Sequence, residues 1–258
     1  MPTLRICTWN INLGRRLGLI LDTVAREPDF AELDVVALQE ASEHGGQEDA
    51  ARLAGQLGAK YEYRQVAAQH LGGRPQANAL IWNSHRLSDP RCRQLDLPAL
   101  SDPTGLPSGE RWLLATMRSQ RRGAVVLDAT LTGPERIRIY SAHADILGFA
   151  HRLRQLGAIL ADDAAHPSVG MSLIAADLNT FGIASRPSWQ AVHRMASSAG
   201  FKDLTNSVGW SHQVRGLRIR QKLDFVFARA APELTFRAWT LSSRASDHLP
   251  ELIELRWP

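Results

Sequence analysis

Short apolar runs, many of them alternating with polar residues, recur along the whole chain and predict β-strands. The predicted strands cover residues 4–10, 33–39, 61–66, 78–83, 111–117, 124–131, 136–143, 172–178, 222–228, 234–241 and 251–257. Apolar residues at helical spacing predict helices at residues 18–28, 48–58, 149–164 and 188–200. The stretch 84–110, which contains four prolines, is predicted to be an irregular surface excursion.

This pattern has too many strands for a simple doubly wound sheet. Successive strands in the middle of the chain favour hairpins and therefore mixed sheets. We predict an α/β (α+β) four-layer sandwich, in which two mixed β-sheets pack face to face and helices flank them. The chain has no internal repeat, and 258 residues fit one domain, so we expect a single domain over residues 1–258.

Composition narrows the functional classes only slightly. The net charge of +4 indicates a mildly basic surface, which suits an anionic substrate without being diagnostic of nucleic acid. Two cysteines do not make a disulfide framework. No apolar stretch reaches the length of a signal peptide or a membrane span, so we expect a soluble, cytoplasmic protein. Nothing in the sequence points to a protein partner.

Polar residues of the kinds that bind metals and phosphates recur at the ends of the predicted strands. They are Asn10, Glu40, His143, Asp177, Asn179, Asp224, Asp247 and His248. Taken singly, each has a structural explanation, such as a turn or an Asx-turn. Taken together, carboxylates directly after apolar runs are costly to desolvate unless a cation pairs with them. The lack of a cysteine cluster or a histidine pair argues against zinc, so Mg²⁺, or Mn²⁺ in its place, is expected.

Such a site suits transfer of a phosphoryl group to water. The chain contains no G-x-S-x-G elbow, P-loop or Rossmann glycine fingerprint, which would indicate other chemistry. The basic segment 215–222 places Arg218, Arg220 and Lys222 just ahead of Asp224. These residues either bind an anionic substrate or form a solvated hairpin arm, and both interpretations remain open.

Six motifs occur in an order that resembles the endonuclease/exonuclease/phosphatase superfamily, which has the deoxyribonuclease I-like fold. They are TWNINLG, DVVALQE, YSAHAD, AADLNTF, KLDFVFA and SDHLPEL, and they extend from Asn10 to His248. The superfamily includes nucleases, abasic-site endonucleases, inositol polyphosphate phosphatases, sphingomyelinases and deadenylases. The resemblance therefore implies a reaction type without a substrate.

The resemblance also implies roles for individual residues. Glu40 is the expected principal metal ligand, with Asn10 beside it and Asp247 as a second metal-side carboxylate. Asp177 and Asn179 are expected to orient the attacking water and to bind the phosphate. His248 is expected to contact the scissile phosphate, while Asp224 fixes the tautomer of His248.

His143 resembles a second imidazole found in pancreatic-type deoxyribonuclease, where a Glu-Arg pair accompanies it. Glu110 and Arg111 stand at the matching place, and the resemblance implies that Arg111 contacts the substrate. Two carboxylate–imidazole pairs, Glu110–His143 and Asp224–His248, would then face each other across the phosphate, so that one histidine donates a proton and the other accepts one. Ala176 stands where the family usually has glycine, and the segments typical of abasic-site endonucleases are missing.

We therefore expect a divalent-metal-dependent phosphodiesterase that uses water to attack phosphorus, most simply a nuclease acting on DNA or another nucleic acid. One alternative keeps the fold and replaces the substrate by a lipid headgroup, an inositol phosphate or a small phosphodiester. A second alternative is a catalytically silent binding domain, against which the complete set of polar residues argues.

Overall fold

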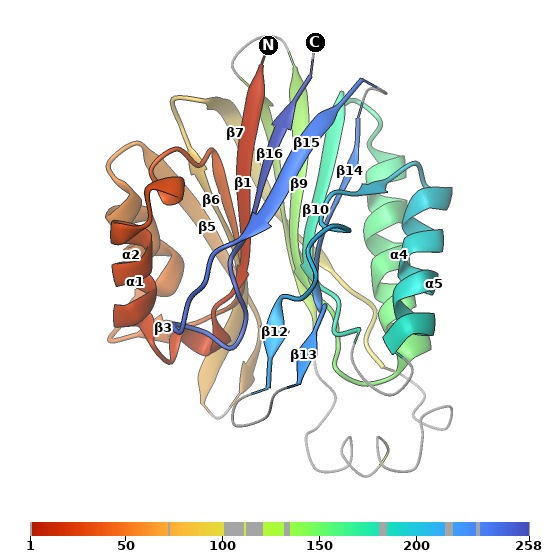
Figure 1. The fold of residues 1–258 in the computed structure, drawn as a ribbon, viewed down its shortest axis with the longest axis horizontal. Coiled ribbons are helices and arrows are strands. Elements are labelled where there is room, and N and C mark those ends of the chain that lie inside the picture. The colour runs from red at the N-terminus through yellow and green to blue at the C-terminus, as the bar shows by residue number, and fades with distance from the viewer. Residues whose placement is uncertain are drawn as a thin grey trace.

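Two six-stranded sheets pack face to face, and helices cover their outer faces (Figure 1). The computed structural model describes residues 2–71, 73–100, 111, 121–131, 135–180, 185–214, 219–230 and 233–257. The predicted four-layer α/β sandwich of two mixed sheets is thus confirmed.

The first sheet has the strand order β15-β16-β1-β2-β6-β5. Its strands are β1 (Thr3–Asn10), β2 (Val35–Ala41), β5 (Tyr61–Leu71), β6 (Arg74–Asn83), β15 (Thr235–Thr240) and β16 (Glu251–Arg256). Strands β1 and β2 are parallel, whereas the other neighbours are antiparallel. Because parallel neighbours need a crossover, helix α1 (Leu17–Arg26) connects β1 to β2, flanked by the short helices η1 (Asn12–Gly14) and η2 (Pro28–Phe30).

The second sheet repeats this plan in the order β11-β14-β10-β9-β8-β7. Its strands are β7 (Leu87–Asp96), β8 (Gly123–Leu131), β9 (Arg136–His143), β10 (Met171–Asp177), β11 (Lys202–Asp203) and β14 (Asp224–Arg229). Here β9 and β10 are the parallel pair, and the crossover is helix α4 (Phe149–Ala165). The other elements with bounds inside the described residues are α2 (Asp49–Leu57), α5 (Ser185–Ser198) and two small antiparallel strand pairs, β3 (Glu43–His44) with β4 (Gln47–Glu48) and β12 (His212–Gln213) with β13 (Arg220–Gln221).

Alternation of side chains along the central strands divides the core into three apolar layers. In β1, Ile6 packs between the sheets with Leu173 of β10, whereas Trp9 faces outward and packs with Ile20 of α1. A third cluster fills the space between the second sheet and helices α4 and α5. In the described part of the chain, no helix is both long enough and apolar enough to cross a membrane.

The predicted elements match the observed ones with two exceptions. Residues 112–117 of the strand predicted at 111–117 lie outside the described residues, and Arg111 itself is helical. The prediction of an irregular excursion over residues 84–110 is wrong where that stretch is described, because β7 runs from Leu87 to Asp96. This strand is the exposed edge of its sheet, and a register shift between Ser88 and Arg91 accommodates Pro90. A proline-containing edge strand lacks the apolar alternation on which the prediction relied.

A buried polar bridge joins the two sheets near the carboxyl ends of their parallel strands. Gln39 of β2 donates a hydrogen bond from Nε2 to Ser141 Oγ of β9, at 3.3 Å. Ser141 Oγ in turn donates to the Leu38 carbonyl oxygen at 2.9 Å, and Thr8 Oγ1 donates to Gln39 Oε1 at 3.3 Å. All three polar side chains are fully buried, so the two hydrogen bonds of Ser141 fix one sheet relative to the other, while the Thr8 hydroxyl orients the Gln39 amide within the first sheet.

Replacing Gln39→Ala should lower the free energy of unfolding by about 3 kcal/mol, since it leaves a cavity and removes the acceptor of the buried Thr8 hydroxyl. Urea denaturation monitored by circular dichroism measures this loss. Gln56→Ala on the exposed surface of α2 is the matched control and should change stability by less than about 0.5 kcal/mol. Equal stability of the two variants would show that the bridge does not hold the sheets together.

Candidate active site

The carboxyl ends of both parallel strand pairs lie at the same edge of the sandwich, the lower edge in Figure 1. There β1 ends at Asn10, β9 ends at His143 and β10 ends at Asp177, while Glu40 is the penultimate residue of β2. The antiparallel neighbour β14 begins at this edge, so its first residue, Asp224, pairs with Asp177. Polar side chains from both sheets therefore converge at this edge.

The segment before β16 reaches the same edge because β16 runs antiparallel to β1. The Trp9 indole Nε1 donates a hydrogen bond to the His248 carbonyl oxygen at 3.1 Å. Asn12, which follows β1, donates from Nδ2 to Asp247 Oδ2 at 2.8 Å. Residues near the two ends of the chain are thus fastened to each other at the site.

Asp177 occupies the centre of this arrangement. Its Oδ2 accepts a hydrogen bond from Asn10 Nδ2 at 2.8 Å, which links the two sheets, and its Oδ1 accepts the Asn179 backbone N–H at 3.0 Å. The Nε2 atoms of His143 and His248 each lie 3.8 Å from Asp177 Oδ2. One carboxylate oxygen therefore lies within reach of two imidazoles.

A hollow with a volume of about 510 Å³ opens at this point. Of the residues predicted from the sequence, Asn10, Glu40, Asp177, Asn179, Asp247 and His248 line it. His143 and Asp224 lie behind this lining and are almost completely buried. The structure thus brings these eight predicted residues to one place.

Backbone strain is concentrated around the hollow. Among the described residues other than glycine, Asn12, Leu13, Glu40, Asn179 and the distant Asp89 have positive φ, all near +50°. Glu40 lies where the pairing of β2 with β6 shifts register, so a bulge re-aims its side chain. Non-glycine residues hold such conformations only where surrounding contacts impose them, and they cluster at functional sites.

His248 forms a buried ion pair with Asp224. The distance from His248 Nδ1 to Asp224 Oδ2 is 2.7 Å. Burial by itself lowers the pKa of His248, but the Asp224 carboxylate outweighs burial and raises this pKa to about 10. Burial likewise raises the pKa of Asp224, but the positive charge of His248 lowers it below its usual value. The ring is therefore held as an imidazolium whose Nε2 faces Asp177.

His143 has the opposite environment. Arg122 Nη1 lies 3.1 Å from its Nδ1, and Asn179 Nδ2 lies 3.0 Å from its Nε2, so both ring nitrogens face N–H donors. Burial, reinforced by the Arg122 charge, lowers the pKa of His143 well below its usual value and keeps the ring neutral. Its predicted partner, Glu110, lies outside the described residues. The two imidazoles thus differ in charge at neutral pH.

Two of the carboxylates that line the hollow, Asp177 and Glu40, lack sufficient positive charge from the protein itself. Burial raises the pKa of the third, Asp247, but His248 and Asn12 outweigh burial and lower it. Burial, with the Asp224 charge, raises the pKa of Asp177 to about 7, although His248 opposes this shift. Burial also raises the pKa of Glu40. A bound cation would relieve both costs, so the residues fit a divalent metal.

Which residues would hold that cation follows from their existing contacts. Among the described residues, ligand atoms of Asp177, Asp224 and His248 lie within 4.8 Å of one another. Asp224 and His248 already bond to each other, however, and an imidazolium cannot bind a metal. The oxygen-rich side of the hollow, with Glu40 and Asp247, suits a hard cation better.

Sequence reasoning missed several residues of the site, among them Arg122 and His212. Arg122 is buried and contacts His143, although in the sequence it is one of two arginines before an apolar strand and looks solvated. His212 lines the hollow, and its ring centroid lies 4.6 Å from that of His248. No local pattern marks either residue, since each reaches the site through a contact between distant segments.

The predicted substrate-binding residues do not behave alike. Arg220 is exposed, and its guanidinium carbon lies 4.5 Å from the ring centroid of Trp210. Lys222 donates from Nζ to the fully buried Glu251 at 2.6 Å, so its ammonium group is held by an internal carboxyl group instead of extending toward a substrate. Arg111 is exposed, and Arg218 lies outside the described residues.

Fold and site together define a class: a four-layer sandwich of two mixed sheets with a cluster of carboxylates, imidazoles and amides at one edge. A family model described as the Endonuclease/Exonuclease/phosphatase family matches residues 7–248. The chain therefore belongs to this family of phosphoester hydrolases. A search of curated proteins found no match.

Several solved structures share the fold at low sequence identity. An endonuclease/exonuclease/phosphatase from Bacteroides vulgatus is 16% identical, with 100% of both chains covered and a TM-score of 0.74. D. rerio TDP2, complexed with single strand DNA product, is 15% identical with 100% of both chains covered and a TM-score of 0.69. A mannosyl-6-phosphatase from Bacteroides thetaiotaomicron is 12% identical, covering 98% of this chain and 100% of its own, with a TM-score of 0.69.

The raised pKa of Asp177 should make the metal-free protein less stable as pH increases. Between pH 3.8, the ordinary pKa of an aspartic acid, and about pH 7, the folded state keeps the Asp177 proton that the unfolded state has released. The stabilisation that this proton provides is complete below pH 3.8 and is lost by about pH 7. In EDTA, the free energy of unfolding of the wild type should therefore fall relative to that of Asp177→Asn between pH 4 and pH 7. Urea denaturation at a series of pH values measures the difference.

Asp162→Asn provides a control of opposite sign. Burial raises the pKa of Asp162, but hydrogen bonds from Arg93 and Tyr140 outweigh burial and lower it. The Asp162 carboxylate therefore stabilises the fold above its unfolded pKa and loses this effect as pH falls, so Asp162→Asn should be most destabilising at neutral pH. If the free energies of unfolding of the wild type and Asp177→Asn differ by the same amount at every pH, the raised pKa of Asp177 is contradicted.

Proposed function

We propose that this protein is a divalent-metal-dependent phosphodiesterase, of nuclease type, in which water attacks the phosphorus atom. The observation that carries this proposal is the position of the Asp177 carboxylate between two imidazoles of different charge, one neutral and one cationic. In-line displacement at phosphorus requires two things from side chains: a base for the attacking water and a cationic hydrogen-bond donor for the phosphate. We assign the first role to Asp177 and the second to His248.

Asp177 is suited to accept the proton of the attacking water. Its pKa of about 7 makes it a useful base near neutral pH, and the Asn179 backbone N–H and Asn10 Nδ2 hold its two oxygens in place. His143, neutral and in contact with Asn179 Nδ2, orients that amide toward the hollow. The attacking side of the reaction is thus built mainly from the second sheet.

His248 is suited to stabilise the negative charge that develops on the phosphate oxygens. Its ring is cationic, it lines the hollow, and Asp224 fixes its orientation through Nδ1. A preoriented charge in a partly dry site stabilises a transition state more than the same charge in water. His248 can also transfer its Nε2 proton to the departing oxygen, which a poor leaving group needs.

Glu40, Asp247 and the amide oxygen of Asn10 are the residues that would hold the cation. When bound, Mg²⁺ or Mn²⁺ would neutralise oxygens of the phosphate. Glu40 and Asp247 line the same hollow as Asp177, so this role is compatible with the positions of the base and the imidazolium.

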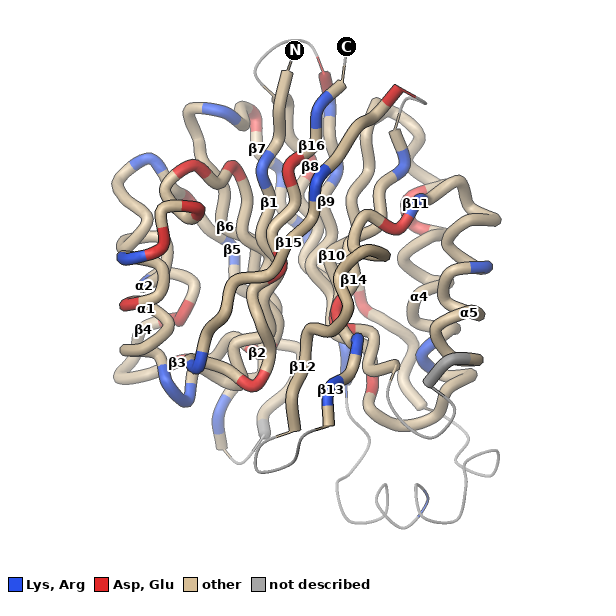
Figure 2. Tube along the Cα trace, viewed as in Figure 1, with Lys and Arg blue, Asp and Glu red and all other residues tan. Residues whose placement is uncertain are grey.

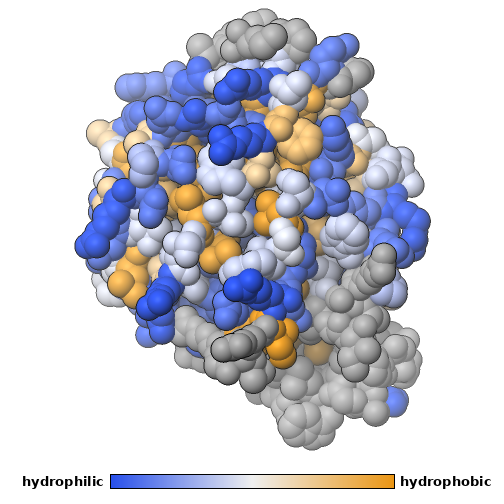
Figure 3. Space-filling model, viewed as in Figure 1, coloured by the Kyte–Doolittle hydropathy of each residue, from blue (hydrophilic) through white to orange (hydrophobic). Residues whose placement is uncertain are grey.

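The surroundings of the hollow support a nucleic acid as substrate. Figure 2 shows that β13, which contains the exposed Arg220, lies close to acidic residues at the ends of the central strands. Arg15, which is exposed, also lines the hollow. On the face seen in Figure 3, apolar residues are interspersed with hydrophilic ones, as suits a charged polymer better than a lipid surface.

A substrate panel tests the reaction class. With Mg²⁺ or Mn²⁺, we expect hydrolysis of plasmid DNA, single-stranded DNA or RNA and of bis(p-nitrophenyl) phosphate, with loss of turnover in EDTA. Abasic duplex, sphingomyelin and p-nitrophenyl phosphate complete the panel, and the last tests monoester hydrolysis. Cleavage restricted to the monoester or to sphingomyelin would contradict the nuclease proposal, and no turnover on any substrate would favour a silent binding domain.

The assigned roles predict the effect of two substitutions. Asp177→Asn and His248→Ala should each lower kcat by about 10²- to 10⁴-fold, because they remove the base and the cationic donor. Steady-state kinetics on bis(p-nitrophenyl) phosphate measure the loss, and circular dichroism checks that the fold persists. Asp22→Asn and His166→Ala, both exposed, are matched controls that should retain wild-type kcat. A fully active His248→Ala variant would refute its role.

A further inference from the structure

A second groove opens beside the candidate active site. Its volume is about 440 Å³, and Asp247 lines both this groove and the catalytic hollow. Three separate segments form its walls: Arg16 just before α1, Trp210 and Arg220 around the β12–β13 hairpin, and Arg244 in the loop before β16. The groove and the catalytic hollow therefore adjoin at Asp247.

The groove is strongly basic. Arg16, Arg220 and Arg244 are all exposed and line it. The carboxylate among its described lining residues is Asp247, which accepts hydrogen bonds from Asn12 at 2.8 Å and from Ser246 at 3.2 Å. Arg16 also donates from Nη1 to the Arg244 carbonyl oxygen at 2.8 Å, which ties two of the walls together. The groove is therefore a built, positively charged site for an anion.

An aromatic surface lies among these charges. Trp210 is half-buried, and the Arg220 guanidinium lies over its ring at 4.5 Å from the centroid. Indole rings and guanidinium planes are the side chains on which nucleobases stack, and such stacking is tolerant of base identity. A polyol phosphate or an inorganic phosphate would use the arginines and leave the aromatic surface unused.

We infer that this groove binds the nucleotide adjacent to the scissile phosphate of a single strand, with its phosphate on Arg16 and Arg244 and its base on the Trp210–Arg220 surface. The inference rests on the proposed function, which it deepens by specifying how substrate beyond the reacting phosphate is held. It makes the protein select strands of at least two nucleotides over small phosphodiesters.

Binding of a strand can be measured without turnover. We propose fluorescence anisotropy of a 5′-labelled single-stranded DNA decamer with the full chain in EDTA. Trp210→Ala should raise Kd by about 5- to 150-fold, which corresponds to the loss of one stacked base. Trp210→Phe should retain most of the affinity. The logarithm of the association constant falls as the logarithm of salt concentration rises, and Arg244→Gln should make this negative slope shallower by about 0.7. This is the change expected when one contact with a single-strand phosphate is lost.

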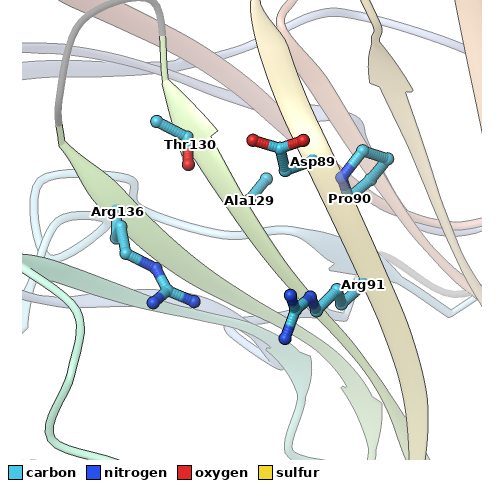
Figure 4. A pocket seen from close by; sticks show the side chains of 6 residues that line it. All are labelled: Asp89, Pro90, Arg91, Ala129, Thr130 and Arg136. Carbon is cyan, nitrogen blue, oxygen red and sulfur yellow. The ribbon is translucent and has the colours of Figure 1, made fainter.

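A hollow at the other end of the second sheet supplies matched controls. Arg91 and Arg136 line it, with Asp89 and Thr130, and Figure 4 shows both guanidinium groups extending to the same side of the strands. Arg136 is the first residue of β9, whose last residue, His143, belongs to the candidate active site. Arg91→Gln and Arg136→Gln remove the same charge far from the proposed groove and should leave Kd unchanged.

Kinetics then separate this inference from the proposed function. For the decamer, Trp210→Ala and Arg244→Gln should raise KM several-fold more than they raise it for bis(p-nitrophenyl) phosphate, which has no second phosphate or base. If the variants bind the decamer as tightly as the wild type, the inference is wrong even if the protein is a phosphodiesterase. The same holds if the variants raise KM equally for the decamer and for bis(p-nitrophenyl) phosphate. If binding depends on these residues but no phosphodiester is hydrolysed, the groove stands and the proposed function fails.

Competition identifies the bound chemistry. An unlabelled decamer should displace the labelled strand from the wild type at much lower phosphate concentration than inorganic polyphosphate of similar length. Equal competition by the two polymers would overturn the assignment of a base to Trp210. Circular dichroism and the Trp210→Phe variant guard against a loss of binding caused by unfolding of the hairpin.

Discussion

The site depends on one constraint: the two sheets must pack so that the carboxyl ends of their parallel strands meet at the same edge. The hydrogen bond from Asn10 to Asp177, at 2.8 Å, spans the sheets at that edge, and the buried Gln39–Ser141 contact fixes them just beneath it. Since interiors are close-packed, a small slide of one sheet would have to break these polar contacts and disturb the apolar core between them. The position of Asp177 between two imidazoles follows from this packing.

The same packing buries charged side chains, which costs desolvation free energy that a protein without a functional site at this edge would avoid. Asp177 and Glu40 are carboxylates with raised pKa values, and Glu40 and Asn179 have strained backbones. Asp224 and His248 avoid this cost by pairing with each other, so the site contains one compensated pair beside carboxylates that still need a cation. Activity and stability thus make opposite demands on these residues.

The reacting centre and its surroundings are built from different kinds of structure. Central strands position Asn10 and Asp177, whose geometry is set by sheet registers, and a bulge in β2 positions Glu40. The basic groove comes from the β12–β13 hairpin and from loops, which can change without disturbing the core. The groove can therefore vary in sequence while the strands keep the candidate active site in place.

The sequence by itself determined the fold class, the order of most strands and helices, and a set of polar residues at strand ends, because periodicity and short motifs are local properties. It misassigned β7, whose edge position and bulge around Pro90 remove the apolar alternation. Only the tertiary structure decided that His143 is neutral and His248 cationic. It also showed that Lys222 donates a hydrogen bond to the buried Glu251. Finally, it placed Arg122 and His212 at the site. These properties depend on burial and on which charges approach from distant segments, and neither is encoded in any short stretch of the chain.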